Sequence, residues 1–241
     1  MSTLRFTVTV GAADVVGVLH LPDGRPAPCV IACHGMGASK DSDKYLLLGR
    51  ELPAAGLALA RFDFRGSGES GGLHRDATIE TRVADLEAVL DHLAKRRELS
   101  GGFGLLGSSL GGFVALWAAS RVAPGTLPVV TWNAPASLRE LPGADPDEAG
   151  RALVAEVLRG GWDVAPAGVR GVLVVQADRD EVVPPAHGRA LYERAGEPRR
   201  LHTIAGADHR LSAMEHRREA LEASLGWLLA HFRDRAVGRR R

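Results

Sequence analysis

The chain has 241 residues, 45% of them hydrophobic, which is enough for one sizeable core, so a single domain over residues 1–241 is expected. Its formal net charge of +1 creates no global field that would attract nucleic acid or an anionic membrane. No stretch approaches the roughly 20 apolar residues of a transmembrane helix, and residues 1–10 lack the apolar core of a signal peptide.

Two segments near the N-terminus, residues 4–10 and 15–21, alternate in polarity around a turn and predict an antiparallel hairpin at a sheet edge. After them, short apolar runs alternate with amphipathic segments, which predicts an α/β fold with a mostly parallel sheet and helices on both faces. The predicted strands are residues 29–33, 57–62, 103–106, 129–132, 172–177 and 199–204. The predicted helices are residues 45–55, 79–97, 110–122, 186–195 and 213–232.

The two cysteines, Cys29 and Cys33, lie on one predicted strand. Their α-carbons are about 13 Å apart along an extended chain, beyond the roughly 7 Å that a disulfide can bridge. Buried, unpaired thiols are typical of a reducing compartment. A cytoplasmic protein without nucleic-acid or membrane partners is therefore expected, while the oligomeric state stays open.

Two segments depart from this alternation. Residues 137–150 are rich in proline, glycine and acidic residues, and residues 151–158 have a helical pattern, so residues 137–161 are predicted to form a small lid-like excursion after the sixth strand. Residues 233–241 are basic and lack apolar periodicity. They are interpreted as a solvated tail in preference to a contact with nucleic acid or an anionic surface.

Ser109 is framed by Gly107 and Gly111, between a predicted strand and a predicted helix. Glycines at these two positions allow close backbone approach, and the sharp turn pushes the serine hydroxyl outward. Ser108 lacks this frame, because leucines occupy the positions two before and two after it. Ser109 is therefore the candidate nucleophile.

Asp180 follows the strand at 172–177, and His209 follows the strand at 199–204, which gives the chain order serine, acid, histidine. Asp178 lies nearer the strand end and remains an alternative acid. Asp208 adjoins the histidine, but neighbours in the chain seldom have the geometry to reach Nδ1. Asp208 is accordingly interpreted as an acceptor that stabilises its loop.

Two further motifs follow predicted strands: His-Gly-Met-Gly at residues 34–37 and Asp-Phe-Arg-Gly-Ser-Gly-Glu-Ser at residues 63–70. With Gly-x-Ser-x-Gly at 107–111, Asp-x-x-Val-Pro at 180–184 and Gly-Ala-Asp-His at 206–209, they make the chain resemble the α/β-hydrolase superfamily over roughly residues 7–232. Within it, the chain looks most like small bacterial serine carboxylesterases, close to cinnamoyl/feruloyl esterases and serine aminopeptidase-like hydrolases.

The resemblance implies a catalytic triad of Ser109, His209 and Asp180, with the backbone N–H groups of Met36 and Leu110 as an oxyanion hole. It also implies that His34 positions its loop by hydrogen bonding and that the motif at residues 63–70 shapes a turn. A pair between the aspartate and the arginine of that motif, Asp63 and Arg65, is expected to lock the loop.

Met36, Trp132 and Trp162 are candidate substrate-binding residues, with Asn133 and Leu138 near the lid. The sequence has no metal-ligand spacing, no phosphate-binding loop and no dinucleotide fingerprint, so no cofactor or metal is expected. The predicted function is a serine hydrolase that cleaves small carboxylic esters through an acyl-enzyme. The alternatives are a peptidase, amidase or acyltransferase on the same triad, and a non-catalytic binding protein.

Overall fold

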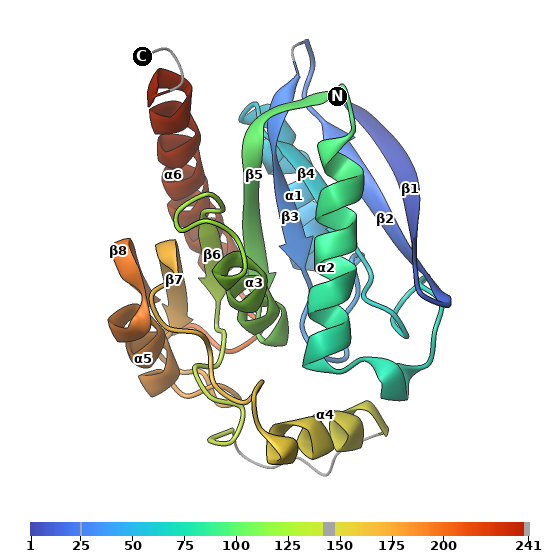
Figure 1. The fold of residues 1–241 in the computed structure, drawn as a ribbon. Helices are drawn as coiled ribbons and strands as arrows, with labels where there is room; N and C mark the ends of the chain where they lie inside the picture. Colours follow the sequence, from blue (N-terminus) through green and yellow to red (C-terminus); the bar gives the residue numbers. More distant parts are fainter. Residues whose placement is uncertain (25, 142–147, 239–241) are drawn as a thin grey trace.

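A single eight-stranded sheet organises the molecule (Figure 1), in a computed structural model that describes residues 1–24, 26–141 and 148–238. The strand order is β1-β2-β4-β3-β5-β6-β7-β8. Strand β2 is antiparallel to both of its neighbours, β1 and β4, and the other seven strands all run in one direction. The strands are β1 Ser2–Val10, β2 Ala13–Leu21, β3 Ala27–Cys33, β4 Ala58–Phe62, β5 Leu99–Ser108, β6 Val129–Trp132, β7 Arg170–Ala177 and β8 Gly196–Ile204. The predicted fold class and the N-terminal hairpin are confirmed.

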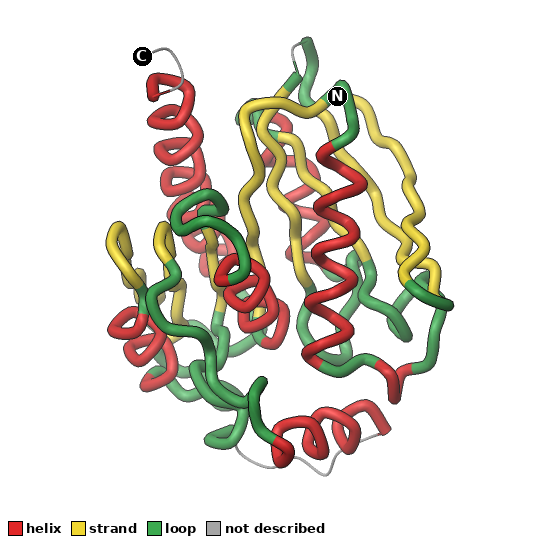
Figure 2. Tube along the Cα trace, in the orientation of Figure 1, coloured by secondary structure: helices red, strands yellow, loops and turns green. Residues whose placement is uncertain are grey.

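Helices cover both faces of the sheet, as the buried apolar strands require (Figure 2). Alternate residues of β3 show the division: Cys29 and Ile31 belong to one hydrophobic cluster, and Val30 and Ala32 to the other. Both cysteines are buried and unpaired. The first cluster includes buried residues of α2 Ile79–Ala94, α3 Leu110–Ser120 and α5 Ala186–Arg194. The second cluster includes buried residues of α1 Asp43–Ala54 and α6 Met214–Gly238.

Two element boundaries differ from the sequence prediction by four residues or more. Strand β5 begins at Leu99, four residues before its predicted start at residue 103, because Leu99 pairs with Ala27 of β3. The glycines that follow Leu99 do not interrupt the strand. Helix α6 continues to Gly238, six residues beyond its predicted end at residue 232, because the arginine and alanine residues of this segment favour helix. Residues 239–241 lie outside the described residues. None of the described helices has the length and hydropathy of a membrane span.

The excursion after β6 contains a helix, α4 Glu148–Arg159, while residues 142–147 lie outside the described part of the chain. Helix α4 crosses below the end of the sheet to which the parallel strands point, close to the short 3-10 helix η1 His74–Asp76 (Figure 1). The buried carboxylate of Glu156 accepts the N–H groups of Ile79, at 2.6 Å, and Glu80, at 3.0 Å. Helix α4 is thus docked on the N-terminus of α2, where a negative charge is stabilised.

Candidate active site

Ser109 occupies the turn between β5 and α3 with a φ of 54° and a ψ of −128°, a backbone conformation that side-chain-bearing residues rarely adopt. The two flanking glycines permit this turn. A Cβ on Gly107 would lie 2.3 Å from the carbonyl oxygen of Gly111, and a Cβ on Gly111 would lie 2.1 Å from that of Cys33. Larger residues at either position would therefore push the strand and the helix apart.

The structure brings together the three side chains predicted to form the triad. The Nε2 atom of His209 lies 3.2 Å from Ser109 Oγ, and its Nδ1 atom lies 2.8 Å from Asp180 Oδ2. A carboxylate only accepts hydrogen bonds, so Nδ1 carries the proton and Nε2 is free to accept one. The Asp180 side chain is fully buried, and its Oδ1 accepts the N–H groups of Val182, at 2.9 Å, and Val183, at 2.7 Å.

The alternative side chains are engaged elsewhere. Asp178 Oδ1 accepts the N–H of Gly206 at 2.7 Å, and Asp208 accepts the N–H and the hydroxyl of Ser212. The interpretation of Asp208 as a loop acceptor is therefore confirmed. Asp180, and not Asp178, is the acid that reaches the imidazole.

The loop that carries Met36 adjoins the Ser109 hydroxyl. A Cβ on Gly35 would lie 3.1 Å from Ser109 Cβ and 3.7 Å from its Oγ. Leu110 begins α3, where the first N–H groups lack intrahelical acceptors and the helix dipole is positive. Met36 is 47% exposed, so its side chain is accessible to solvent.

His34 holds this loop through hydrogen bonds of both of its ring nitrogens. Its Nε2 accepts the N–H of Phe64 at 3.0 Å, so its Nδ1–H donates to the carbonyl oxygen of Gly35 at 2.8 Å. Burial, aided by the nearby Arg82 guanidinium, lowers the pKa of His34 to about 4. Protonation of His34 at Nε2 would set the new N–H against the N–H of Phe64, which donates to that nitrogen. The expected positioning role of His34 agrees with these contacts.

Acidification is expected to destabilise the fold through His34. Its pKa is lower in the folded chain than the ordinary 6.5, so below pH 6.5 the unfolded state binds the proton more readily. The free energy of unfolding should fall by about 3 kcal/mol between pH 6.5 and pH 4 from this group alone. Urea titrations across that range measure the loss. The His34→Gln variant, which keeps an acceptor for Phe64, should lose less, and an unchanged pH slope would contradict the assignment.

The expected pair of Asp63 and Arg65 does not form. Asp63 is fully buried and accepts from Lys40 Nζ at 3.0 Å and from the N–H groups of Lys40, at 2.7 Å, and Glu69, at 3.0 Å. Arg65 instead pairs with Asp85 on α2, with Nε 3.0 Å from Oδ1. Each buried carboxylate meets a cation from another segment, which the local motif could not reveal.

The side chains of the two tryptophans make their contacts elsewhere than at the Ser109 hydroxyl. Trp132 is fully buried, and its Nε1–H donates to the hydroxyl of Ser224 on α6 at 2.9 Å, so its interpretation as a substrate-binding residue is wrong. Trp162 packs on Trp117, with ring centroids 4.6 Å apart. Trp117 is eight residues along α3 from Ser109, roughly 12 Å away along the helix axis.

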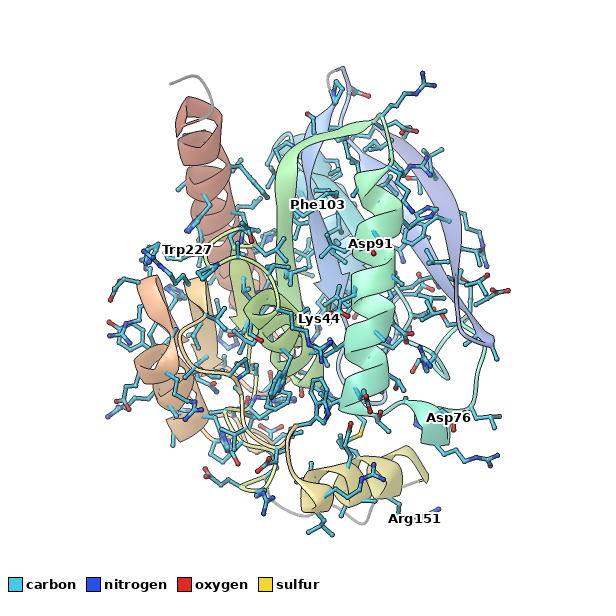
Figure 3. All side chains as sticks on the ribbon, in the orientation of Figure 1. Lys44, Asp76, Asp91, Phe103, Arg151 and Trp227 are labelled. Carbon is cyan, nitrogen blue, oxygen red and sulfur yellow. The ribbon has the colours of Figure 1, made fainter. Side chains whose placement is uncertain are left out.

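Lys44 is a neighbour of the turn that the sequence pattern does not single out. It stands in the first turn of α1, near the middle of the molecule in Figure 3, and its Nζ donates to Ser108 Oγ at 2.8 Å. Burial, with Arg217 and Arg210 nearby, lowers the pKa of this amine to about 8. No local spacing connects Lys44 with a turn 64 residues later.

Comparisons with known proteins agree with this architecture. Residues 24–143 match the family model of the serine aminopeptidases, S33. Ferulic acid-bound Est1E from Butyrivibrio proteoclasticus has a TM-score of 0.78 and 19% identity, over 94% of this chain and 98% of that one. A putative hydrolase from Agrobacterium vitis has a TM-score of 0.75 and 24% identity, over 94% and 98%.

A dienelactone hydrolase from Anabaena variabilis has a TM-score of 0.68 and 24% identity, over 95% of this chain and 97% of that one. No curated protein sequence matches the chain significantly. The strand order, the turn between β5 and α3 and the family match lead to one assignment. The chain has the α/β-hydrolase fold.

Proposed function

We propose that this chain is a serine hydrolase that cleaves carboxylic esters of small molecules through an acyl-enzyme. The observation that carries the proposal is the continuous series of hydrogen bonds from Ser109 Oγ through the His209 ring to Asp180, at 3.2 and 2.8 Å. A serine hydroxyl is a weak nucleophile until a positioned base takes its proton, and this series supplies that base and its orienting acid.

The reaction follows from the geometry. Ser109 Oγ attacks the ester carbonyl carbon while its proton passes to His209 Nε2, and the N–H groups of Met36 and Leu110 hold the oxyanion. Each such donor is worth about 3–4 kcal/mol of transition-state stabilisation. The intermediate collapses to an acyl-serine, and the alkoxide leaves with the proton from His209. Water, deprotonated by His209, then attacks the acyl-serine; the bond to Ser109 Oγ breaks, His209 returns the proton to Oγ, and the acid is released.

Two features bear on the substrate class. The relative solved with ferulic acid and the dienelactone hydrolase favour ester substrates, whereas the serine aminopeptidase model favours amides as a second candidate. An alkoxide needs less proton assistance to leave than an amine does, so a triad of this kind is expected to favour esters. The buried, unpaired Cys29 and Cys33 support action in the reducing cytoplasm.

The proposal is tested by covalent labelling with a fluorophosphonate and by turnover of p-nitrophenyl butyrate. We expect one label per chain, located on Ser109 by peptide mapping, because this hydroxyl alone is joined to the imidazole among the described contacts. Alanine p-nitroanilide, measured in parallel, should be cleaved more slowly than the ester. Folded protein that takes no label would contradict the proposal, and faster cleavage of the anilide would favour the amidase candidate.

A further inference from the structure

Asn133 follows β6 directly and is completely buried. Its φ of 52° is uncommon for a residue with a side chain, so the surrounding contacts must hold it there. In the sheet, β6 lies between β5, which ends next to Ser109, and β7, which ends three residues before Asp180. Asn133 is thus placed between the elements that carry two of the proposed catalytic residues.

The side-chain amide of Asn133 joins β7 to the segment that carries His209. Its Nδ2 donates to the carbonyl oxygen of His209 at 2.9 Å, and its Oδ1 accepts the N–H of Ala177, the last residue of β7, at 2.8 Å. A carbonyl oxygen only accepts and an N–H only donates, so the orientation of the amide is unambiguous. The backbone N–H of Asn133 donates to Val175 at 2.9 Å and fixes the residue itself to β7.

The residue before Asn133 completes the connection. The carbonyl oxygen of Trp132 accepts the N–H of Ser109 at 2.8 Å. Residues 132 and 133 together therefore bind the backbone of Ser109, of His209 and of Ala177, three residues before Asp180. Among the described contacts, Asn133 makes no hydrogen bond to the reacting atoms. Its influence on the reaction would act through the position of His209.

Few other bonds hold the His209 backbone. Its own N–H reaches the exposed side chain of Glu181 only at 3.5 Å, the outer limit of a hydrogen bond. The bond from Asn133 is shorter and comes from a completely buried side chain. Because His209 Nε2 is already 3.2 Å from Ser109 Oγ, a small displacement of this segment would separate the two atoms.

We propose that Asn133 is a positioning residue, which sets the backbone of His209 relative to Asp180 and Ser109 and so keeps the imidazole within reach of the hydroxyl. The inference rests on the proposed serine hydrolase function. It assigns to the end of β6 a role in catalysis that touches neither substrate nor reacting atoms.

Two substitutions separate the amide contacts from the backbone conformation. Asn133→Gly adopts the positive φ without strain and removes both side-chain bonds. Asn133→Asp keeps the acceptor for Ala177 but sets an oxygen against the carbonyl oxygen of His209. In both variants, kcat for p-nitrophenyl butyrate should fall roughly 100-fold, the cost of a displacement of about 1 Å, while KM changes little. The rate of fluorophosphonate labelling should fall with kcat.

Ser224→Ala is the matched control, because it removes a buried 2.9 Å hydrogen bond to the neighbouring Trp132 without touching His209 or Ala177. Thermal melts give the folded fraction of each variant. We expect Ser224→Ala to lose stability but to keep the wild-type kcat per folded molecule.

Wild-type kcat and labelling rates in folded Asn133→Gly and Asn133→Asp would overturn the inference. An equal loss of kcat in Ser224→Ala would do so too, since it would reduce the effect to general destabilisation. Wild-type protein that neither labels nor turns over ester would instead remove the proposed function, and with it the premise.

Discussion

Ser109→Ala is expected to lower kcat for p-nitrophenyl butyrate by about 10⁶-fold, the scale of loss when a triad nucleophile is removed. Among the described contacts, the Ser109 hydroxyl, at 3.2 Å, is the one hydroxyl that lies within hydrogen-bond distance of His209 Nε2. No other side chain can therefore replace Ser109 as the nucleophile. The fold should persist, because alanine keeps the Cβ that this turn already accommodates. Steady-state kinetics, corrected for spontaneous hydrolysis, measure the loss, and circular dichroism verifies folding.

The control for this prediction is non-additivity. His209→Ala should cost about as much as Ser109→Ala, and the double variant should be no slower than either single one, since the two groups act as a unit. Losses that multiply in the double variant would show that the two residues act independently. That outcome would contradict attack by Ser109 assisted by His209.

Much of the fold is encoded in local patterns. The alternation of apolar strands and amphipathic helices predicted the sheet, and the paired glycines around Ser109 predicted the turn that exposes its hydroxyl. The position of each candidate at a strand end predicted their convergence, because parallel strands end at one edge of a sheet. Asp180, His209 and Ser109 were therefore predictable although they lie far apart in the chain.

The remaining features depend on contacts between distant segments. Trp132 ends a strand beside the proposed site, yet its side chain points to the opposite face and bonds to Ser224 on α6. Asp63 and Arg65 are two residues apart in one motif, but each pairs with a charge from another loop or helix. A residue's neighbours in sequence do not determine which face it presents.

The same limit applies to buried polar groups. Glu156 docks α4 on the N-terminus of α2 across 77 residues, and Asn133 spans 76 residues to reach His209. Composition indicated that the segment around α4 was unusual, but a buried carboxylate or amide has no periodic signal. Such groups are recognised only when the tertiary structure shows where their hydrogen bonds go.

Asp180→Asn is expected to lower kcat by about 10⁴-fold, through the tautomer of His209 and not through loss of packing. The N–H groups of Val182 and Val183 both donate to Oδ1, at 2.9 and 2.7 Å, so the asparagine oxygen must take that position. Its NH₂ group then replaces Oδ2, 2.8 Å from His209 Nδ1, and donates to it. Oδ1 also lies 3.0 Å from Nδ1, but the closer NH₂ group disfavours a proton on that nitrogen, so the imidazole proton moves to Nε2, which can no longer accept the proton of Ser109.

Asp178→Asn is the matched control, because an amide oxygen can replace the carboxylate oxygen that accepts the N–H of Gly206 at 2.7 Å. It should retain nearly wild-type kcat, whereas Asp180→Asn should not. Because the forced tautomer removes the base without moving the ring, Asp180→Asn should keep its KM while losing kcat. The opposite pattern, with the larger loss in Asp178→Asn, would mean that Asp178 orients the histidine during turnover, and the acid of the proposed triad would have to be reassigned.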